Sequence, residues 1–498
     1  MVIGAGYNPP AMPTRVLLGV DIGTSSAKGV ALDHAGRVLA RAEVVYAYSV
    51  PRRGWAEADA DVWWSAAREI LARLSAAVAH ARVEGVGITG QAPTLLPVDA
   101  GGEPLRPAIL WLDVRSESEA ADLNAQLGPG AEARSGNRMH AYYLGPKLAW
   151  LRRHEPDVYA ATSTVLQSHS YPVLRLTGAR ATDYSSAALC APLYDARARR
   201  WSEAGCSAVG VQTRQMPDLA PAHAMAGKVT DEAARETGLP AGTPVVVGGA
   251  DFAASALAAG VTDPGEACLM LGTSGNLIMP FEAPIFDTRL INAHHVGCDR
   301  YLALGATLAG AALQWFHATF APEVALPALD AEAAAVPAGA EGARLLPYLQ
   351  GERTPVWDAA ARGAFTGLSM AHGRGHLYRA VLEAVAVSFR HCLEVLRERG
   401  LTLHELIAVN GGARSEIWRQ IICDALGVPL EYLPENPGAP AGAALLAGLG
   451  TGALPDVTVA KRWRGRVIRH QPDAARTALY AKMLGERQPL YAALQSVG

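Results

Sequence analysis

One short pattern occurs twice in this chain: an apolar run followed at once by a turn of glycines and hydroxyl residues. The first copy joins an apolar run over 15–21 to the turn 21–26, and the second joins 266–271 to the turn 272–275. Each turn lies between two strand-like runs, so each predicts a β-hairpin. Turns of this composition offer backbone N–H groups and hydroxyls, which suit a phosphate. Two such hairpins facing each other across a cleft would hold one nucleotide between two related domains.

The length of the chain also favours two domains. At 498 residues it exceeds what one hydrophobic core usually organises, and the strand pattern restarts after Gly260. We therefore expect domains over 14–255 and 256–498. Half of the residues are apolar and 18% are charged, which is typical of a globular protein. A formal net charge of -3 predicts no electrostatic attraction to nucleic acid or to an anionic membrane.

The cysteines and the apolar runs indicate in which cellular compartment the protein is located. The six cysteines form no C-x-x-C pair and no metal-ligand spacing with histidine, which favours a reducing compartment. Residues 1–15 lack a basic segment followed by a long apolar one, so they predict a loose leader and not a secretory signal. The other apolar runs are interrupted before they reach spanning length. We expect a soluble, cytoplasmic protein.

A single carboxylate follows the apolar run 245–249. Asp251 stands after two glycines and before a helix of small residues. Open α/β sheets place their chemistry at the carboxyl ends of strands, which favours a catalytic acid or base here. The alternative is an aspartate that only caps the following helix, and the local pattern leaves both interpretations open.

Further positions in the two halves suit a nucleotide. In the first hairpin, Asp21 is a carboxylate able to bind magnesium, and Lys28 is a cation. In the second half, an apparent strand over 405–409 delivers Gly411 and Gly412 to the start of a helix capped by Ser415. Helix N-terminal N–H groups at such a junction favour phosphate.

Several other elements are predicted by periodicity and by cap residues. We expect helices over 58–79 with Asp59 or Asp61 as N-cap, from 147, over 306–316, 377–399, 439–449 and 472–496, and a surface helix or insertion over 328–342. Residues 83–89 and 109–115 are predicted as strands, 182–186 as a polar loop, and 345–355 as an apolar strand that carries a polar loop. By themselves, Trp111 is more typical of a core residue, and Asp113 with Arg115 of an ion pair that steadies a loop.

The motifs in their order resemble those of a known family. In sequence they are DIGTSSAK (21–28), GWAEADADVWW (54–64), RPAILWLDVRS (106–116), GGADFAASALAAG (248–260), LGTSGN (271–276), GERTP (351–355) and NGGARSEIWRQIICDALG (410–427). Together they are similar to the FGGY carbohydrate kinases of the actin-like ATPase superfamily, and within these most similar to the xylulokinases. The resemblance covers about residues 16–449.

This resemblance implies an α/β fold, with two ribonuclease-H-like (actin-like ATPase) domains flanking a catalytic cleft. It also implies roles for single residues. Asp251 would be the general base that takes the proton of the sugar hydroxyl, and Asp21 would act near the magnesium ion. The remaining implied nucleotide-binding positions are Thr24, Ser25, Ser26 and Lys28 around the γ-phosphate, and Gly272, Thr273, Gly310, Gln314, Gly411 and Gly412 along the nucleotide.

The implied reaction is the ATP- and Mg²⁺-dependent phosphorylation of a ketopentose hydroxyl, with D-xylulose giving D-xylulose 5-phosphate. The implied substrate-binding positions are Gln91, Ala92, Pro93, Trp111, Tyr142, Asp251 and Phe252. Alternatives are a kinase for another small sugar or polyol (ribulose, a glycerol-like polyol or an aldonate), or a nucleotide-gated protein of the actin-like superfamily without kinase activity. The partners expected are the sugar and ATP, and the resemblance also makes a homodimer possible.

The chain departs from the xylulokinase pattern at three positions. Pro93 stands where a histidine is usual, Phe252 where the residue after the base is usually Asn or Gln, and Ser170 where many members have Asp. Proline offers neither a side-chain donor nor a backbone N–H. Either neighbours compensate, or the substrate is a different sugar. The candidate neighbours are Trp111, Tyr142, His169 and Asn276.

Overall fold

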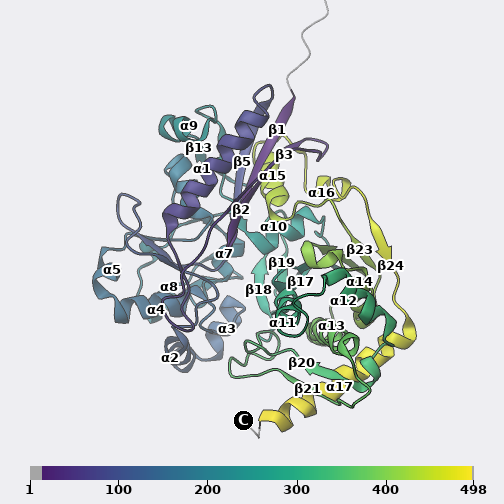
Figure 1. Cartoon of the computed structure of the whole chain (residues 1–498). Coiled ribbons are helices and arrows are strands. Elements are labelled where there is room, and N and C mark those ends of the chain that lie inside the picture. The colour runs from purple at the N-terminus through teal and green to yellow at the C-terminus, as the bar shows by residue number, and fades with distance from the viewer. Residues whose placement is uncertain (1–13, 496–498) are drawn as a thin grey trace, which may run out of the picture.

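A computed structural model describes residues 14–495 of the chain. Residues 1–13 of the predicted leader therefore lie outside the described residues, and Arg15 is already the first residue of a strand. The described chain forms two seven-stranded sheets, each with helices on its faces, which lie side by side in Figure 1.

The first sheet is built on an antiparallel meander followed by parallel strands. The order is β13-β14-β5-β1-β2-β3, with β15 also paired to β5. The meander is β1 (Arg15–Ile22), β2 (Ser26–Asp33) and β3 (Val38–Val45); the parallel strands are β5 (Arg82–Gly90), β14 (Pro244–Val246) and β15 (Gly249–Ala250); β13 (Met225–Lys228) is the antiparallel edge.

The second sheet repeats this arrangement. Its order is β18-β19-β17-β16-β22-β23-β24. The meander is β16 (Glu266–Leu271), β17 (Ser274–Phe281) and β19 (Tyr301–Leu308); the parallel strands are β22 (Glu405–Val409) and β23 (Leu430–Tyr432); β18 (Ile291–His294) and β24 (Ile468–His470) are the edges. Two sheets with a meander and then strands parallel to its first member confirm the expected pair of ribonuclease-H-like domains.

Helices cover the sheets, and their starts follow from the sequence. The long covering helices are α1 (Ala60–Ala77), α13 (Arg374–Glu398), α14 (Glu416–Leu426) and α17 (Ala474–Gln495). The Asp59 side chain accepts the N–H of Asp61 and caps α1, and Ser415 accepts the N–H of Trp418 and caps α14. Of the two cap candidates predicted for the first helix, the structure has Asp59, and the predicted cap Ser415 is confirmed. An N-cap oxygen satisfies one of the helix N–H groups that lack an internal partner.

Two small-residue helices lie between the sheets (Figure 1): α10 (Asp251–Ala258) and α15 (Ala439–Gly450). Although α15 comes from the second half of the chain, it packs on β1 and β5 of the first sheet. A Cβ atom at Gly87 would lie 2.0 Å from the carbonyl oxygen of Ala443, so only glycine allows this approach. The predicted boundary at 255/256 falls inside α10, and the division into 14–255 and 256–498 stays a prediction about folding units.

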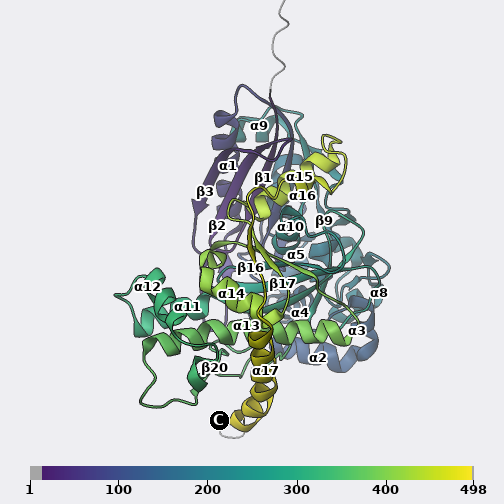
Figure 2. The same cartoon turned by 90° about the vertical axis from the view of Figure 1, so that its right-hand side faces the viewer.

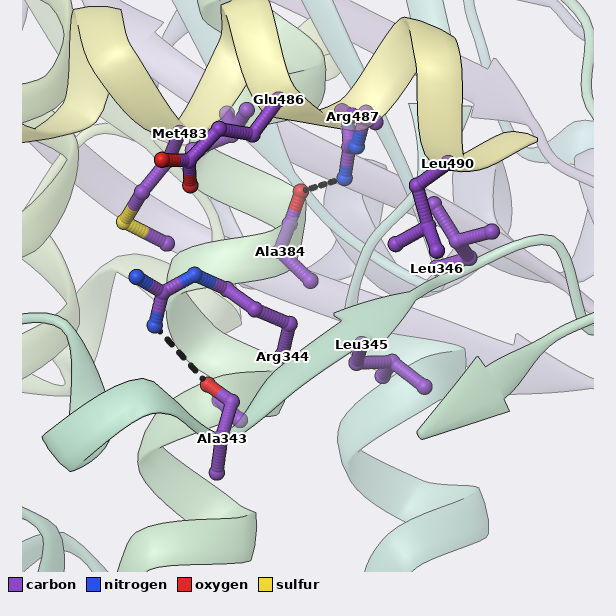
Figure 3. A pocket seen from close by; sticks show the side chains of 11 residues that line it. Ala343, Arg344, Leu345, Leu346, Ala384, Met483, Glu486, Arg487 and Leu490 are labelled. Atoms are coloured by element: carbon purple, nitrogen blue, oxygen red, sulfur yellow. Dashed lines mark hydrogen bonds between the residues drawn. The ribbon is translucent and has the colours of Figure 1, made fainter. Parts of the chain in front are cut away.

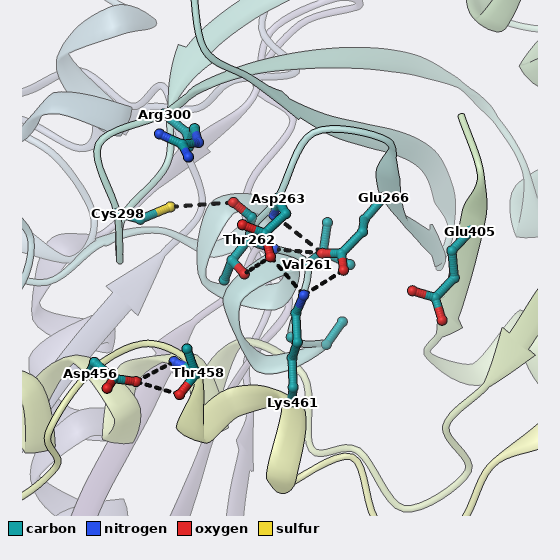
Figure 4. A network of polar contacts seen from close by, with 12 residues as sticks. Val261, Thr262, Asp263, Glu266, Cys298, Arg300, Glu405, Asp456, Thr458 and Lys461 are labelled. Carbon is teal, nitrogen blue, oxygen red and sulfur yellow. Dashed lines mark hydrogen bonds and ion pairs between the residues drawn. The ribbon is translucent and has the colours of Figure 1, made fainter. Parts of the chain in front are cut away.

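A polar network holds the segment after α15 against the connection between the sheets (Figure 4). From α16 (Val459–Arg462), the Lys461 ammonium donates to Asp263 at 2.7 Å and to Glu266 at 2.6 Å. The Trp463 indole N–H donates to the carbonyl oxygen of His34 at 3.3 Å, at the tip between β2 and β3. This segment therefore contacts both halves of the molecule.

The last helix, α17, lies at the opposite end of the molecule from α15 and α16 (Figure 1 and Figure 2). Figure 3 shows α17 over α13 and β20 (Arg344–Leu346), with a small pocket between them. The buried Arg487 donates to the Ser388 hydroxyl at 2.9 Å and to the carbonyl oxygen of Ala384 at 2.7 Å. Both acceptors belong to α13, so α17 is fixed by side chain as well as by packing.

The remaining elements form small additions to the two sheets. The paired short strands are β4 (Glu57–Ala58) with β7 (Ala108–Ile109), β6 (Leu96–Val98) with β8 (Thr164–Leu166), β9 (Ala181–Asp183) with β12 (Asp218–Ala220), β10 (Tyr194–Asp195) with β11 (Arg200–Trp201), and β20 with β21 (Ala364–Thr366). The other helices are α2 (Glu117–Leu127), α3 (Pro129–Ser135), α4 (Leu144–His154), α5 (Pro156–Ala161), α6 (Ser170–Thr177), α7 (Tyr184–Ala188), α8 (Glu203–Val209), α9 (Asp231–Thr237), α11 (Gly310–Phe320) and α12 (Leu326–Ala335).

Three local predictions were wrong. The predicted polar loop 182–186 is the end of β9 and the start of α7, because Asp183 accepts the N–H groups of Ser185 and Ser186 and lets these small residues be buried. The predicted helix 306–316 begins only at Gly310, since β17 holds the chain in β19 as far as Leu308. The predicted strand 109–115 ends at Ile109, where the pairing of β7 with β4 stops.

The ion pair predicted in this loop is confirmed. The Arg115 guanidinium contacts the Asp113 carboxylate at 2.7 Å, and both side chains are buried. Across residues 14–495, no helix combines the length and the hydropathy that crossing a membrane requires.

Candidate active site

Two carboxylates lie at the carboxyl ends of strands that flank β5. On one side of β5, Asp21 of β1 lies opposite Thr89; on the other, Gly249 of β15 lies opposite the same Thr89. Asp251 follows two residues after Gly249. Because β1, β5 and β15 are parallel, both carboxylates leave the sheet at the same edge.

Asp21 is held by its neighbour on β5. The Thr89 hydroxyl donates to Oδ1 of Asp21 at 3.0 Å. Burial raises the pKa of Asp21 to about 6, while the Thr89 hydrogen bond and the charge of Lys28 act in the opposite direction. Lys28 lies opposite Asp21 in the β1–β2 pair, and its ammonium is 3.6 Å from the Glu43 carboxylate. Asp21 is therefore an oriented, partly desolvated carboxylate that a cation would hold in its ionised form.

Asp251 is delivered by a turn that only glycine permits. Gly248 has φ of 77°, and a Cβ atom there would lie 1.7 Å from the carbonyl oxygen of Ile88. The chain then enters α10, whose first residue is Asp251. Burial raises the pKa of Asp251 to about 8, and the nearby charge of Asp21 adds to this shift.

The interpretation of Asp251 as a helix cap is not favoured. The N-cap of α10 is Ala250, which has no side-chain cap hydrogen bond, and the Asp251 carboxylate accepts the N–H of the adjacent Phe252 at 2.7 Å. A carboxylate with a pKa raised toward neutrality, beside a second carboxylate, is suited to accept a proton.

The first hairpin presents Thr24 and Ser25 at its tip, with Ser26 starting β2. The Thr24 hydroxyl donates to Oε1 of Gln91 at 3.1 Å and accepts the indole N–H of Trp111 at 3.0 Å. Thr24 and Ser26 are half-buried, and Ser25 is exposed. The hairpin is thus joined by hydrogen bonds to the segments after β5 and β7.

The second hairpin and two further segments gather at one edge of the second sheet. The N–H of Gly310 donates to the carbonyl oxygen of Gly272 at 2.9 Å, and the N–H of Ala311 to that of Thr273 at 3.0 Å. These contacts set the hairpin on the start of α11, where Gln314 is exposed one turn later.

The Gly-Gly segment lies beside this hairpin. It follows β22, which runs parallel to β16, and a Cβ atom at Gly412 would lie 2.9 Å from the carbonyl oxygen of Leu271. Gly411 is exposed. The structure thus brings together every nucleotide-binding position predicted in the second half of the chain.

The predicted substrate positions surround the first hairpin. Gln91 is 1% exposed, and its Nε2 has no hydrogen-bond partner among the described residues, so it is a buried donor available to a ligand. The Tyr142 hydroxyl donates to the carbonyl oxygen of Ala92 at 3.2 Å, and the rings of Tyr142 and Trp111 are 6.3 Å apart, edge to face.

The unusual residues Pro93 and Phe252 are both buried. Only 5% of Phe252 is exposed, and it belongs to the apolar cluster that also contains Ala92 and Tyr143. Phe252 and Pro93 therefore contribute buried apolar surface and no polar side-chain contact.

Of the neighbours named as compensating residues, His169 is buried, with Nδ1 unpartnered among the described residues and its pKa lowered to about 4 by burial. Asn276 is half-buried in β17. His169 is therefore a neutral imidazole, which can donate or accept but carries no charge.

Two site residues were missed by the sequence analysis. Arg353 lies in the loop between β20 and β21, and its Nη2 donates to the Ser274 hydroxyl at 3.2 Å. The fully buried Lys147 donates to the carbonyl oxygens of Asp113 at 3.1 Å and Tyr142 at 3.0 Å, so it fixes two loops of the substrate side. For Arg353, the adjacent charges of Glu352 and Arg353 in the motif GERTP were a sequence pattern that could have indicated a site residue. Lys147 had no such pattern, because hydrogen bonds from a buried lysine to backbone carbonyl oxygens cannot be recognised in a single sequence.

Two ribonuclease-H-like sheets, each with a glycine–hydroxyl hairpin, place this chain in the class of two-domain nucleotide-binding proteins. The profile described as "FGGY family of carbohydrate kinases, N-terminal domain" matches residues 16–258, and that of the C-terminal domain matches residues 267–451. The chain belongs to the FGGY family of carbohydrate kinases. It is accordingly a sugar kinase, with ATP as a substrate.

Individual proteins agree with this assignment. The chain is 35% identical over 470 residues to "Xylulose kinase" of Escherichia coli (strain K12), which covers 93% of this chain and 96% of that protein. The crystal structure of xylulose kinase from Rhodospirillum rubrum is 37% identical, with a TM-score of 0.89, and covers 97% of this chain and 99% of that one. The structure titled "a xyloylose kinase from Brucella ovis" is 34% identical, with a TM-score of 0.90, and covers 97% and 100%.

Proposed function

We propose that this kinase transfers the γ-phosphoryl group of ATP to a hydroxyl of D-xylulose and releases D-xylulose 5-phosphate and ADP. The observation that carries the proposal is the pair of carboxylates, Asp251 and Asp21, at neighbouring strand ends of the first sheet, where burial and the charge of Asp21 raise the pKa of Asp251 to about 8. Similarity to xylulose kinases along nearly the whole chain supports the choice of sugar. It favours xylulose over ribulose, glycerol-like polyols, aldonates and a protein without kinase activity.

Asp251 acts as the general base. A sugar hydroxyl is a weak nucleophile, so a carboxylate must accept its proton as the new O–P bond forms. The oxygen of the sugar attacks the γ-phosphorus, the bond to the β–γ bridging oxygen breaks, and its electron pair leaves with ADP. No covalent enzyme intermediate is needed, because positioning and charge neutralisation supply the remaining catalysis.

Asp21 is the residue proposed to hold Mg²⁺. Residues 14–495 contain no group of three or more His, Cys, Asp or Glu side chains that could hold a metal ion alone. One or two carboxylates together with substrate phosphates are nevertheless the usual ligands of Mg²⁺, and the oriented, partly desolvated Asp21 fits that role. Magnesium bound with ATP would neutralise phosphate charge.

The sugar is proposed to lie against Gln91, Trp111 and Tyr142. The free Nε2 of Gln91 is the donor proposed for a sugar hydroxyl. The rings of Trp111 and Tyr142 form the side walls, and Lys147 fixes the loops that carry them. Apolar contacts from Pro93 and Phe252 exclude water near Asp251, which strengthens electrostatic interactions at the reacting group.

A coupled assay of ADP release tests the function. Purified protein is given Mg-ATP and, in separate reactions, D-xylulose, D-ribulose, glycerol or gluconate. We expect the highest kcat/KM with D-xylulose, and a loss of about 10²–10⁴-fold in kcat for Asp251→Asn with little change in ATP affinity. A higher kcat/KM with another sugar would overturn the substrate, and absence of sugar-stimulated turnover would overturn the proposed reaction.

A further inference from the structure

Arg353 connects the two hairpins. Its Nη2 donates to the Ser274 hydroxyl in the second hairpin, and its guanidinium carbon lies 5.3 Å from the centre of the Trp111 ring. Trp111 in turn donates to the Thr24 hydroxyl in the first hairpin. The cation therefore lies between the two segments expected to hold phosphate.

Arg353 is half-buried and lacks the carboxylate partner that buried arginines of this chain have. Arg115 contacts two carboxylates, those of Asp113 and Glu57, and Arg379 contacts Glu383. Within residues 14–495, no Asp or Glu oxygen forms an ion pair with Arg353, and the Ser274 hydroxyl is its one side-chain hydrogen-bond partner.

The adjacent Glu352 is turned away from the guanidinium. Its Oε1 accepts the backbone N–H of Arg353, and its Oε2 accepts the Thr307 hydroxyl. Burial lowers the pKa of Arg353 from its ordinary value, while the nearby Tyr142 and Glu352 act in the opposite direction. Even partial burial of a charge that has no ion-pair partner is costly, so this geometry favours an anionic ligand.

We propose that Arg353 is a catalytic residue that binds the phosphoryl group during its transfer, and then the phosphate ester of the product. The inference rests on the proposed kinase function. As the sugar oxygen bonds to the γ-phosphorus and the bond to ADP breaks, Asp251 takes the proton and the guanidinium contacts the oxygens that carry the moving negative charge. A planar guanidinium can donate to two such oxygens at once.

The surroundings of Arg353 prepare it for this contact. The Trp111 ring lies within cation–π distance of the guanidinium, and the Ser274 hydroxyl fixes one nitrogen, while the other N–H groups have no side-chain partner among residues 14–495. Since Ser274 and Trp111 belong to different halves of the chain, the site is complete only when the two halves are close together.

Three variants test the proposal. Arg353→Met removes the charge, and Arg353→Lys keeps the charge but loses the two-pronged donor. Arg362→Met is the matched control, because Arg362 lies in the same loop and donates only to the carbonyl oxygens of Ala359 and Ala361. We expect kcat to fall about 10²–10³-fold in Arg353→Met, the usual loss for a donor to developing negative charge. The sugar KM should stay nearly constant, Arg353→Lys should be intermediate and Arg362→Met unchanged.

Calorimetry with Mg-ADP and fluoroaluminate, which mimics the phosphoryl group in transit, gives a second readout. We expect Arg353→Met to bind Mg-ADP like the wild type but to lose at least about 10²-fold in affinity when fluoroaluminate is added. Unchanged kcat, or a rise in sugar KM alone, would overturn the role of Arg353. If the wild type phosphorylates no sugar, the proposed function fails. The fluoroaluminate titration without sugar then decides Arg353 separately, and equal affinities in the two proteins would refute it.

If Arg353→Met proves less stable than the wild type, Arg353→Lys carries the comparison, because it keeps both the stem and the charge. Added guanidinium ion should then restore part of the kcat of an Arg353→Ala variant. Absence of such rescue in a folded variant would count against the proposal.

Discussion

The side chain of Asn137 pairs with the backbone of Asn292 as a neighbouring strand would. Its Nδ2 donates to the carbonyl oxygen of Asn292 at 2.8 Å, and its Oδ1 accepts the N–H of Asn292 at 2.8 Å. Asn292 belongs to β18, the edge of the second sheet, whereas Asn137 comes from the segment between α3 and α4 of the first half. One amide side chain thus supplies hydrogen-bond partners to the backbone of an edge strand and links the two halves of the chain.

Asn137→Ala is expected to destabilise the protein by about 2–3 kcal/mol, because it leaves buried N–H and C=O groups of β18 without partners. The measurement is chemical unfolding followed by circular dichroism. Asn124→Ala is the control: its side chain donates only to the carbonyl oxygen of Met139, so the loss should be about 1 kcal/mol. Equal losses in the two variants would contradict the role of the Asn137 pair.

Gly87→Ala should prevent close packing of α15 on β5. The added Cβ would lie 2.0 Å from the carbonyl oxygen of Ala443, and a backbone atom cannot move aside as a flexible side chain can. We expect a loss of about 3 kcal/mol or more, or no soluble protein. Gly130→Ala in α3 serves as the comparison, since its nearest atom is 3.6 Å away; it should be neutral or slightly stabilising. A stable Gly87→Ala protein would refute the packing argument.

The raised pKa of Asp251 predicts how activity depends on pH. A base must be ionised to accept a proton, so kcat/KM should rise by roughly tenfold per pH unit and level off above the pKa of about 8. The pH profile is measured with D-xylulose at fixed free Mg²⁺. The residual kcat/KM of Asp251→Asn should not show this rise with pH. A profile that is flat between pH 6 and about 8 would exclude Asp251 as the titrating base.

The same shift makes a prediction about stability. The native pKa of Asp251 lies above the ordinary value of 3.8, so between that value and about 8 the native protein binds more protons than the unfolded chain. Stability contributed by this group is therefore present at low pH and is lost as pH rises toward 8. Relative to Asp251→Asn, the melting temperature of the wild type should fall across this range. A constant difference would contradict the assigned pKa.

Thr89→Val should weaken the use of Mg²⁺. It removes the hydroxyl that holds Oδ1 of Asp21, and second-shell changes of this kind usually cost about 10–100-fold in metal affinity. The Mg²⁺ concentration for half-maximal rate, measured at fixed ATP, should rise accordingly. Thr237→Val controls for loss of a buried hydroxyl, because the Thr237 hydroxyl bonds to the carbonyl oxygen of Ala233 in α9, away from the two carboxylates. An identical Mg²⁺ titration in Thr89→Val and wild type would argue against Asp21 as the metal ligand.

The sequence predicts well what depends on local periodicity and on turn composition. Both hairpins, the strand before Asp251 and the caps Asp59 and Ser415 are decided within a few residues, and the structure has them all. The end of β19 was misjudged because pairing with β17, a tertiary interaction, overrides the helical pattern around 306–309. Arg353 was missed for a similar reason: its lack of a carboxylate partner is visible only when distant segments are placed around it.

The packing of α15 on β1 and β5 has a consequence for how the protein is made. About 360 residues separate the end of β5 from the end of α15. At typical rates of about 5–20 residues per second, a ribosome needs roughly 20–70 s to add them. Throughout that time the nascent first sheet presents the bare surface around Gly19 and Gly87 that α15 later covers, so a cell has a long interval in which chaperones must protect this surface from other chains.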